Sequence, residues 1–300
     1  LWRSLPVHAD QHVVAFAPSN SNIVYIANDG GVYRSANKGA TVEKVSNGLV
    51  ITQFYNINFW NTLSNVMGGG SQDNGVNFTT GGLSWTNIYG GDGGWIIIDP
   101  VDPRIIYTES QNANIVKSTD GGRTWVGKTD GIVGPRPWEG VMAMDPSNHL
   151  RIFYGTDRVL RSTDGLDTAW QECSQVLSGE VTSIAFAPTL SSRMYVGTTA
   201  GRVYRSDDGG DTQPWTEKSG SLPRRPITGI HPISNGDDVV LSVGGLSGAA
   251  SSESVYRSTD GGDTWTDISG DLPDVVGNSV AVDPSNSSTL YLATDTGVFR

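Results

Sequence analysis

The sequence has 300 residues, and its 20 Lys and Arg residues against 31 Asp and Glu residues give a formal net charge of -11. Nucleic acids and anionic membranes both require a basic surface, so we expect neither as a partner. Gly is abundant at 38 residues, but the 9 Trp and 10 Tyr residues are too many for a disordered chain. Many short strands joined by tight turns fit this composition.

Cysteine usage and apolar runs argue against a disulfide-bonded fold and a membrane-spanning protein. The single cysteine, Cys173, cannot form an internal disulfide, and we expect it to be a small strand residue near Trp170 rather than a reactive thiol. No apolar run approaches the roughly 18 residues that a membrane span needs. The chain begins Leu1-Trp2-Arg3, with neither an initiator Met nor a signal-peptide pattern, so we expect it to be part of a longer polypeptide.

Along the chain, one pattern repeats at a period of roughly 40 to 45 residues, which is typical of β-propellers. A typical repeat has an apolar run, a second run with Tyr, a short run ending in Arg-Ser, a polar turn, and a final strand that begins near a Trp. The first repeat has Val42 in the Trp place. The seven repeats fall at residues 12–49, 53–91, 94–132, 140–178, 181–223, 226–273 and 278–300. The pattern therefore predicts an all-β, seven-bladed β-propeller of four-stranded blades that forms one domain, residues 1–300.

The seventh repeat ends after its third strand, at Arg300. Residues 1–6 resemble the fourth strands that follow Trp215 and Trp265, so we expect them to close this last blade. Pairing the two termini in one sheet would remove an open strand edge.

The turn between the third and fourth strands carries the most regular motif. Its Ser hydroxyl and Asp carboxylate can bond the backbone of their own turn, and its Gly residues allow positive φ. In the second repeat, residues 53–91, the turn is degenerate, with Phe78 in the Ser place and Thr80 in the Asp place. We interpret the turn residues as structural; they are Ser118, Asp120, Gly122, Thr124, Trp125, Asp164, Asp208, Ser258, Asp260, Gly262, Thr264 and Trp265.

This Ser-x-Asp-x-Gly-x-Thr-Trp turn resembles the Asp-box, or BNR repeat, of sialidases, xyloglucanase-type glycoside hydrolases, sortilin-like receptors and a photosystem assembly factor. The stretches Val7–His12, Asn28–Tyr33, Gln53–Tyr55 and Gln72–Gly75 are also similar to those of large secreted bacterial BNR proteins. The resemblance implies a secreted or cell-surface protein, and a ligand site on the face opposite the Asp-boxes.

Polar residues are concentrated in the loops of that opposite face. Asp29, Asp73 and Asp92 could supply the carboxylate pair that glycoside hydrolysis requires, or they could each brace a turn beside their glycines. Residues placed to contact a ligand are Asp10, Gln72, Asn74, Arg136, Trp138 and Glu139. Pro135 and Pro137 stiffen the loop that carries Trp138, which suits a stacking platform for a sugar or a contact with a protein.

Two metal sites are conceivable. His8, Asp10 and His12 alternate along an extended segment, about 7 Å apart from one to the next, and could bind a metal only if the segment bends. The alternative is a hydrogen-bonded cluster. Oxygen ligands at Asp29, Asp73 or Asp92 would suit Ca²⁺, although none has the spacing of a known calcium loop.

Three functions follow from these residues. The first is binding of a glycan or protein ligand on the face opposite the Asp-boxes. The second is cleavage of a polysaccharide by two carboxylates on that face, as a glycoside hydrolase or a lyase. The third is a structural role in a larger surface assembly. Sialidase activity is not expected, because the chain has no Phe-Arg-Ile-Pro segment and Arg136, Arg224 and Arg225 lie on only two blades.

Overall fold

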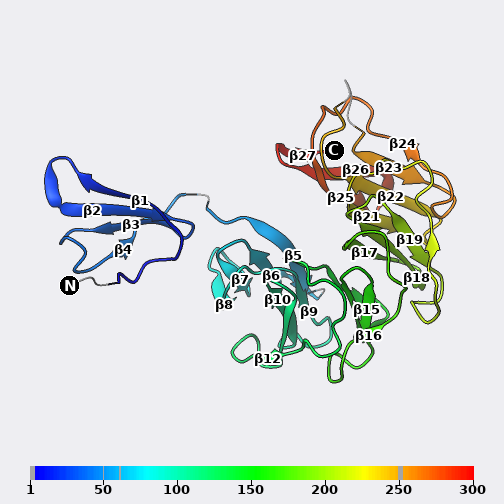
Figure 1. Ribbon diagram of the computed structural model, residues 1–300, viewed down its shortest axis with the longest axis horizontal. Coiled ribbons are helices and arrows are strands. Elements are labelled where there is room, and N and C mark those ends of the chain that lie inside the picture. The colour runs from blue at the N-terminus through cyan, green and yellow to red at the C-terminus, as the bar shows by residue number, and fades with distance from the viewer. Residues whose placement is uncertain (1–3, 50, 61, 249–252) are drawn as a thin grey trace. The chain divides into compact units, whose positions relative to one another are not determined.

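The computed structural model describes residues 4–49, 51–60, 62–248 and 253–300. All regular structure in these residues is β-strand (Figure 1). No helix that could cross a bilayer occurs among them. The chain divides into two compact units, a first unit Leu1–Ile98 and a second unit Asp99–Arg300.

The first unit contains two four-stranded antiparallel sheets, with the orders β1-β2-β3-β4 and β5-β6-β7-β8, and ends with strand β9. Its strands are β1 (Gln11–Ala17), β2 (Asn20–Asn28), β3 (Gly31–Ser35), β4 (Glu43–Lys44), β5 (Phe54–Trp60), β6 (Leu63–Ser71), β7 (Gly75–Thr79), β8 (Thr86–Tyr89) and β9 (Ile96–Ile98).

The remaining strands follow the same order, β12-β11-β10-β9, β13 to β16, β17 to β20, β21 to β24 and β25 to β27. Those of the second unit are β10 (Ile106–Ser110), β11 (Asn114–Ser118), β12 (Val126–Gly127), β13 (Met142–Asp145), β14 (Asn148–Gly155), β15 (Val159–Ser162), β16 (Gln171–Glu172), β17 (Val181–Ala187), β18 (Leu190–Thr198), β19 (Val203–Ser206), β20 (Thr216–Glu217), β21 (Ile227–Ile233), β22 (Asp238–Val243), β23 (Val255–Ser258), β24 (Thr266–Asp267), β25 (Gly277–Asp283), β26 (Asn286–Thr294) and β27 (Gly297–Phe299).

The described residues therefore form seven antiparallel sheets in chain order, six with four strands and the last with three. This confirms the predicted fold class, a seven-bladed β-propeller. The strand expected to complete the last sheet, residues 1–6, begins with residues 1–3, which lie outside the described part of the chain. Residues 4–6 form no strand.

The register of the second sheet corrects one detail of the predicted turns. Met67 pairs with Thr79, as Val24 pairs with Ser35 in the first sheet, so Thr79 and not Phe78 takes the Ser place. The hydroxyl of Thr79 accepts a hydrogen bond from Gly81 N at 3.1 Å. The prediction that Phe78 takes the Ser place was wrong by one residue, because the strand register depends on the pairing partner, which the sequence of this turn does not show.

Neighbouring sheets of the second unit are joined by their tryptophans. Trp170, Trp215 and Trp265 are buried, and each donates its indole N–H to a backbone oxygen of the preceding sheet's fourth-strand segment. The acceptors are the carbonyls of Lys128 at 2.8 Å, Cys173 at 2.9 Å and Lys218 at 2.7 Å. Each Trp thus combines apolar burial with a satisfied polar tip.

Cations make a second set of joints at the same edge of these sheets. A basic side chain of one sheet donates to a glycine carbonyl in the polar turn of the next. The bonds are Lys117 Nζ to Gly165 O at 2.7 Å, Arg151 Nη2 to Gly209 O at 2.7 Å, Arg161 Nη1 to Gly209 O at 3.3 Å and Arg205 Nη1 to Gly261 O at 2.8 Å. The edge that carries the turns is thereby held together from sheet to sheet.

Candidate functional site

Three carboxylates of the first unit converge, and we call them the acid cluster: Asp10, Asp29 and Asp73. Asp10 precedes β1, Asp29 lies between β2 and β3, and Asp73 lies between β6 and β7. One oxygen from each lies within 4.8 Å of the others. Loops of two different sheets therefore deliver like charges to one place, which the spacing along the sequence does not reveal.

Local backbone geometry explains how the loops meet. Asp10 and Asp73 have φ of 57° and 59°, a left-handed conformation that Asp tolerates better than most residues. Gly30 has no side chain where a Cβ would lie 2.5 Å from the His8 ring. The ring can therefore reach across, and its Nε2 lies 2.7 Å from the Asp73 carbonyl oxygen.

The members of the cluster have different neighbouring groups. Burial, together with the negative charges of Asp29 and Asp92, raises the pKa of Asp73. The pKa of His12 is raised because its ring hydrogen-bonds to the Asp29 carboxylate. Asp92 accepts a hydrogen bond from Asp73 N at 2.7 Å, so its carboxylate also fixes the loop. Asp29 and Asp73 thus have different surroundings, a histidine partner for Asp29 and like charges for Asp73.

The acid cluster has the donor set that a hard cation such as Ca²⁺ accepts, namely carboxylate oxygens from Gly-rich loops. The predicted ligand set of His8, Asp10 and His12 is divided by the structure. Asp10 joins Asp29 and Asp73, whereas His8 bonds to the Asp73 carbonyl and His12 to the Asp29 carboxylate.

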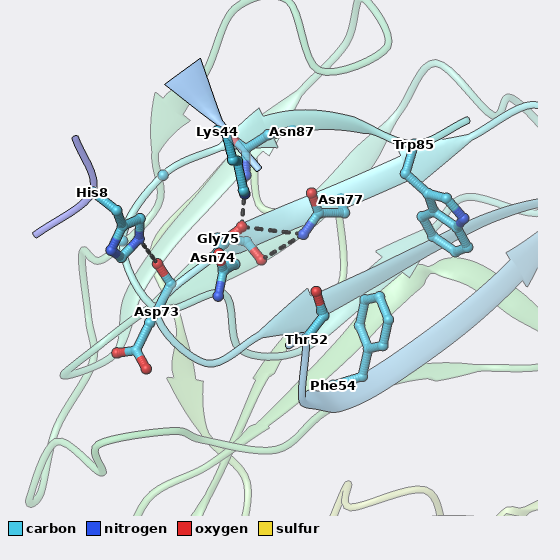
Figure 2. A pocket seen from close by; sticks show the side chains of 12 residues that line it. His8, Lys44, Thr52, Phe54, Asp73, Asn74, Gly75, Asn77, Trp85 and Asn87 are labelled. Atoms are coloured by element: carbon cyan, nitrogen blue, oxygen red, sulfur yellow. Dashed lines mark hydrogen bonds between the residues drawn. The ribbon is translucent and has the colours of Figure 1, made fainter. Parts of the chain in front are cut away.

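A pocket of about 650 Å³ lies next to the cluster and shares Asp73 with it. Phe54 and Trp85 form a tilted aromatic pair at one end, with ring centroids 5.7 Å apart (Figure 2). Both rings are about two-fifths exposed, at 41% and 39%. The other lining residues are His8, Lys44, Thr52, Asn74, Gly75, Asn77, Asn87, Gly90 and Gly91.

Glycines in β6 allow close packing beside this pocket. Gly69 pairs with Asn77, and a Cβ at Gly69 would lie 2.5 Å from the Phe54 ring. Phe54 can therefore lie flat over its own sheet. On the opposite face, a Cβ at Gly70 would lie 1.7 Å from the Gly94 carbonyl oxygen. The Gly-Gly-Gly run was the available sequence signal for this close packing, and sequence reasoning did not use it.

The amides predicted to bind ligand have structural partners in the same loops. Asn74 Nδ2 lies 3.3 Å from the Asp29 carbonyl oxygen and 3.1 Å from the Gln72 carbonyl oxygen. Gln72 is exposed, and its backbone N–H donates to the Gln53 carbonyl at 3.0 Å. Asn74 thus joins the β6–β7 loop to the Asp29 loop and still lines the pocket.

Arg136, Trp138 and Glu139 lie in the second unit, in the loop before β13. Trp138 is 57% exposed, Arg136 is exposed and Glu139 is half-buried. Pro137 between them is buried and anchors the loop.

The turn aspartates sit in a different environment from the acid cluster. Asp164 Oδ1 accepts from Ser162 Oγ at 2.9 Å and Oδ2 accepts from Thr168 Oγ1 at 2.7 Å. These bonds lower the pKa of Asp164 to about 2. The other turn residues make the same pattern, at Ser118, Asp120 and Thr124, at Ser206, Asp208 and Thr212, and at Ser258, Asp260 and Thr264.

Comparison with known proteins places the fold among propellers. No family model matches the sequence. A xyloglucanase from Paenibacillus sp. is 28% identical over 267 residues, which cover 72% of this chain and 25% of that protein. The chain therefore spans about a quarter of the length of the curated relative that it matches.

Two solved structures are similar over nearly the whole chain. YCF48 from Cyanidioschyzon merolae has a TM-score of 0.60 at 16% identity, covering 98% of this chain and 95% of its own. An ancestral GH74 enzyme has a TM-score of 0.60 at 17% identity, covering 97% of this chain and 44% of its own. At these identities the similarity shows the fold alone.

Proposed function

We propose that the chain is a secreted or surface-exposed, carbohydrate-binding propeller of the Asp-box type, with its ligand site in the first unit. The observation that carries the proposal is that Asp73 belongs to both the acid cluster and a pocket with an exposed aromatic pair. Aromatic faces stack on sugar rings, and carboxylates and amides bond their hydroxyls. The similarity to a protein described as a xyloglucanase supports a glycan over a protein ligand.

Binding of soluble xyloglucan and other polysaccharides, measured by isothermal titration calorimetry, tests this proposal. We expect Asp73→Ala combined with Asp92→Ala to weaken binding at least tenfold, because the pair supports both the charge and the loop conformation. Asp271→Ala removes an exposed carboxylate elsewhere and is the matched control. Unchanged affinity in the double variant would remove the ligand site from the acid cluster.

The geometry of the same carboxylates favours glycoside hydrolysis as a second candidate. Asp29 and Asp73 each place a carboxylate oxygen within 4.8 Å of the other, and glycoside hydrolysis requires two carboxyl groups that flank one bond. The raised pKa of Asp73 suits the acid, and Asp29, which pairs with His12, is the candidate for its partner.

Reducing-sugar release from a polysaccharide panel separates hydrolysis from binding. We expect Asp73→Asn and Asp29→Asn each to abolish release while leaving measurable binding, because the amide keeps the shape and removes the proton or the charge. Release that persists in both variants would exclude this carboxyl pair as the catalytic one.

We also propose that residues 1–300 form a single domain within a longer secreted polypeptide. The repetition of one sheet type throughout the chain supports a single domain. The quarter-length coverage of the xyloglucanase supports a longer polypeptide.

A further inference from the structure

Glu109, near the end of β10, is a buried carboxyl group at an unusual place in the repeat. It lies three residues after Ile106, which pairs with Ser118, and has no exposed surface. The residues at the same register position of the other four-stranded sheets are all small: Ala27, Gly70, Gly155, Gly197 and Ser242.

Small residues are required there because the next sheet packs against them. A Cβ at Gly155 would lie 2.6 Å from the Val181 Cβ, and a Cβ at Gly197 would lie 2.7 Å from the Ile227 Cβ. In the third sheet, Glu109 occupies this position. A glycine in the facing segment makes the room, since a Cβ at Gly140 would lie 2.0 Å from the Tyr154 hydroxyl oxygen.

Glu109 and Tyr154 form a buried hydrogen-bonded pair. The Tyr154 hydroxyl donates to Glu109 Oε2 at 2.8 Å, and Gly140 N donates to Glu109 Oε1 at 2.9 Å. Burial and the neighbouring Glu109 charge raise the pKa of Tyr154, which keeps the phenol protonated as a donor. An apolar pair of the same size would often be at least as stable, so stability alone does not account for this arrangement.

The pair fixes one end of the loop that carries Trp138. Gly140 ends this loop, and its N–H is held by Glu109. The other attachment is the Trp138 carbonyl, which accepts a hydrogen bond from Asn112 N at 3.1 Å. Asn112 lies in the β10–β11 turn with a left-handed φ of 62°. Two loops are thus joined at two points, while the Trp138 side chain remains exposed.

We infer that Glu109 and Tyr154 are positioning residues that hold Trp138 as a preformed stacking platform for one pyranose ring, a second contact site in the second unit. The sugar class rests on the proposed function. Fixing an aromatic ring before binding lowers the entropic cost of ordering it on the ligand. The prolines at 135 and 137 restrict the same loop further.

Two measurements on the full chain test this inference. Hydrogen exchange of peptides covering residues 110–114 and 134–141, without ligand, reports the loop. Calorimetric titration with xyloglucan reports the platform. We expect Trp138→Ala to weaken binding about tenfold. Tyr154→Phe should speed loop exchange about tenfold and weaken binding about threefold.

Two substitutions at Glu109 should increase the rate of loop exchange by different amounts. Glu109→Gln keeps an oxygen that accepts from Gly140 N, so its loop should exchange more slowly than that of Glu109→Ala. Should Glu109→Ala fail to fold, Glu109→Gln and Tyr154→Phe still decide the question. Tyr195→Phe is the matched control, because its buried hydroxyl donates to Gly236 O at 2.7 Å, away from this loop.

Unchanged loop exchange in Tyr154→Phe and Glu109→Gln would overturn the positioning role. Wild-type affinity in Trp138→Ala, while Asp73→Ala with Asp92→Ala weakens binding, would overturn the platform and leave the proposed function intact. The exchange measurement needs no ligand. It therefore decides the positioning role even if the wild-type protein binds no polysaccharide, a result that would overturn the proposed function.

Discussion

The two units use the same residue types for different purposes. In the second unit, Trp170, Trp215 and Trp265 are at most 7% exposed and donate to the preceding sheet. In the first unit, Trp85 begins the corresponding strand, yet it is 39% exposed and contacts Phe54 in the pocket. Three motif tryptophans thus join sheets in the second unit, whereas Trp85 lines a pocket in the first unit. Trp125 of the second unit is half-buried and donates to Gly122 O in its own turn.

The aspartates of the two units also differ, in their hydrogen bonds and in the direction of their pKa shifts. Those in the turns of the second unit accept several hydrogen bonds, which lower the pKa of Asp164 to about 2. Asp73 in the acid cluster meets burial and like charges, which raise its pKa. The hydrogen bonds of the turn aspartates suit a structural role, and the like charges around Asp73 support the proposal that the acid cluster is a ligand site.

The largest expected effect tests the tryptophans. Trp215→Ala should lower the free energy of unfolding by about 3–5 kcal/mol, because it removes a buried ring and a joint between two sheets. Trp85→Ala should cost less than about 1 kcal/mol, since its ring is partly exposed. Urea denaturation followed by circular dichroism measures both. Equal losses would show that Trp85 also joins sheets in solution.

The next effect tests the turn aspartates. Asp164→Ala should lower the free energy of unfolding by about 1–2 kcal/mol at neutral pH, a hydrogen-bond value reduced for solvent exposure. The folded-state pKa is depressed, so this contribution is present above the unfolded pKa of roughly 4 and is lost as pH falls through about 2. Denaturation of wild type and variant from pH 2 to 7 should show the two curves converging in acid.

The first sheet supplies the matched control for that pH dependence. Asn37 occupies the Asp place there, and its Oδ1 accepts from Thr41 N at 2.8 Å without a charge. The loss caused by Asn37→Ala should therefore be the same at pH 2 and pH 7. A loss that shrinks in acid would show that something other than aspartate ionisation controls the turns.

The smallest effect tests the acid cluster and has the opposite sign. The folded-state pKa of Asp73 is raised, so ionising it becomes a penalty as pH rises from the unfolded pKa toward the folded one. Asp73→Asn should raise the melting temperature at pH 7 by about 1–3 °C and have no effect below both pKa values. Differential scanning calorimetry measures the shift, with Asp271→Asn as control. A lower melting temperature would mean that Asp73 is stabilised as an anion.

Particular residues show how far the sequence could predict the site. Asp10, Asp29, Asp73 and Asp92 were named from their loop positions, and the structure brings all four into one region. The single-residue error at Thr79 arose because strand register is decided by pairing partners, which a degenerate turn does not display.

Other residues could not be found without the fold. Glu109 stands in an ordinary strand pattern, and only alignment of the sheets by register shows that its position is otherwise Ala, Gly or Ser. The pairing of Phe54 with Trp85 depends on the flat surface at Gly69, which composition does not reveal.

The fold class and the repeating turn can be predicted from the amino-acid sequence, because both depend on short-range periodicity and on hydrogen bonds within a few residues. Which charges converge, which tryptophans are buried and where a carboxyl group is enclosed become known only from the folded chain. Those properties depend on loops and strands far apart in the chain, and on the space left by individual glycines such as Gly30, Gly69 and Gly140.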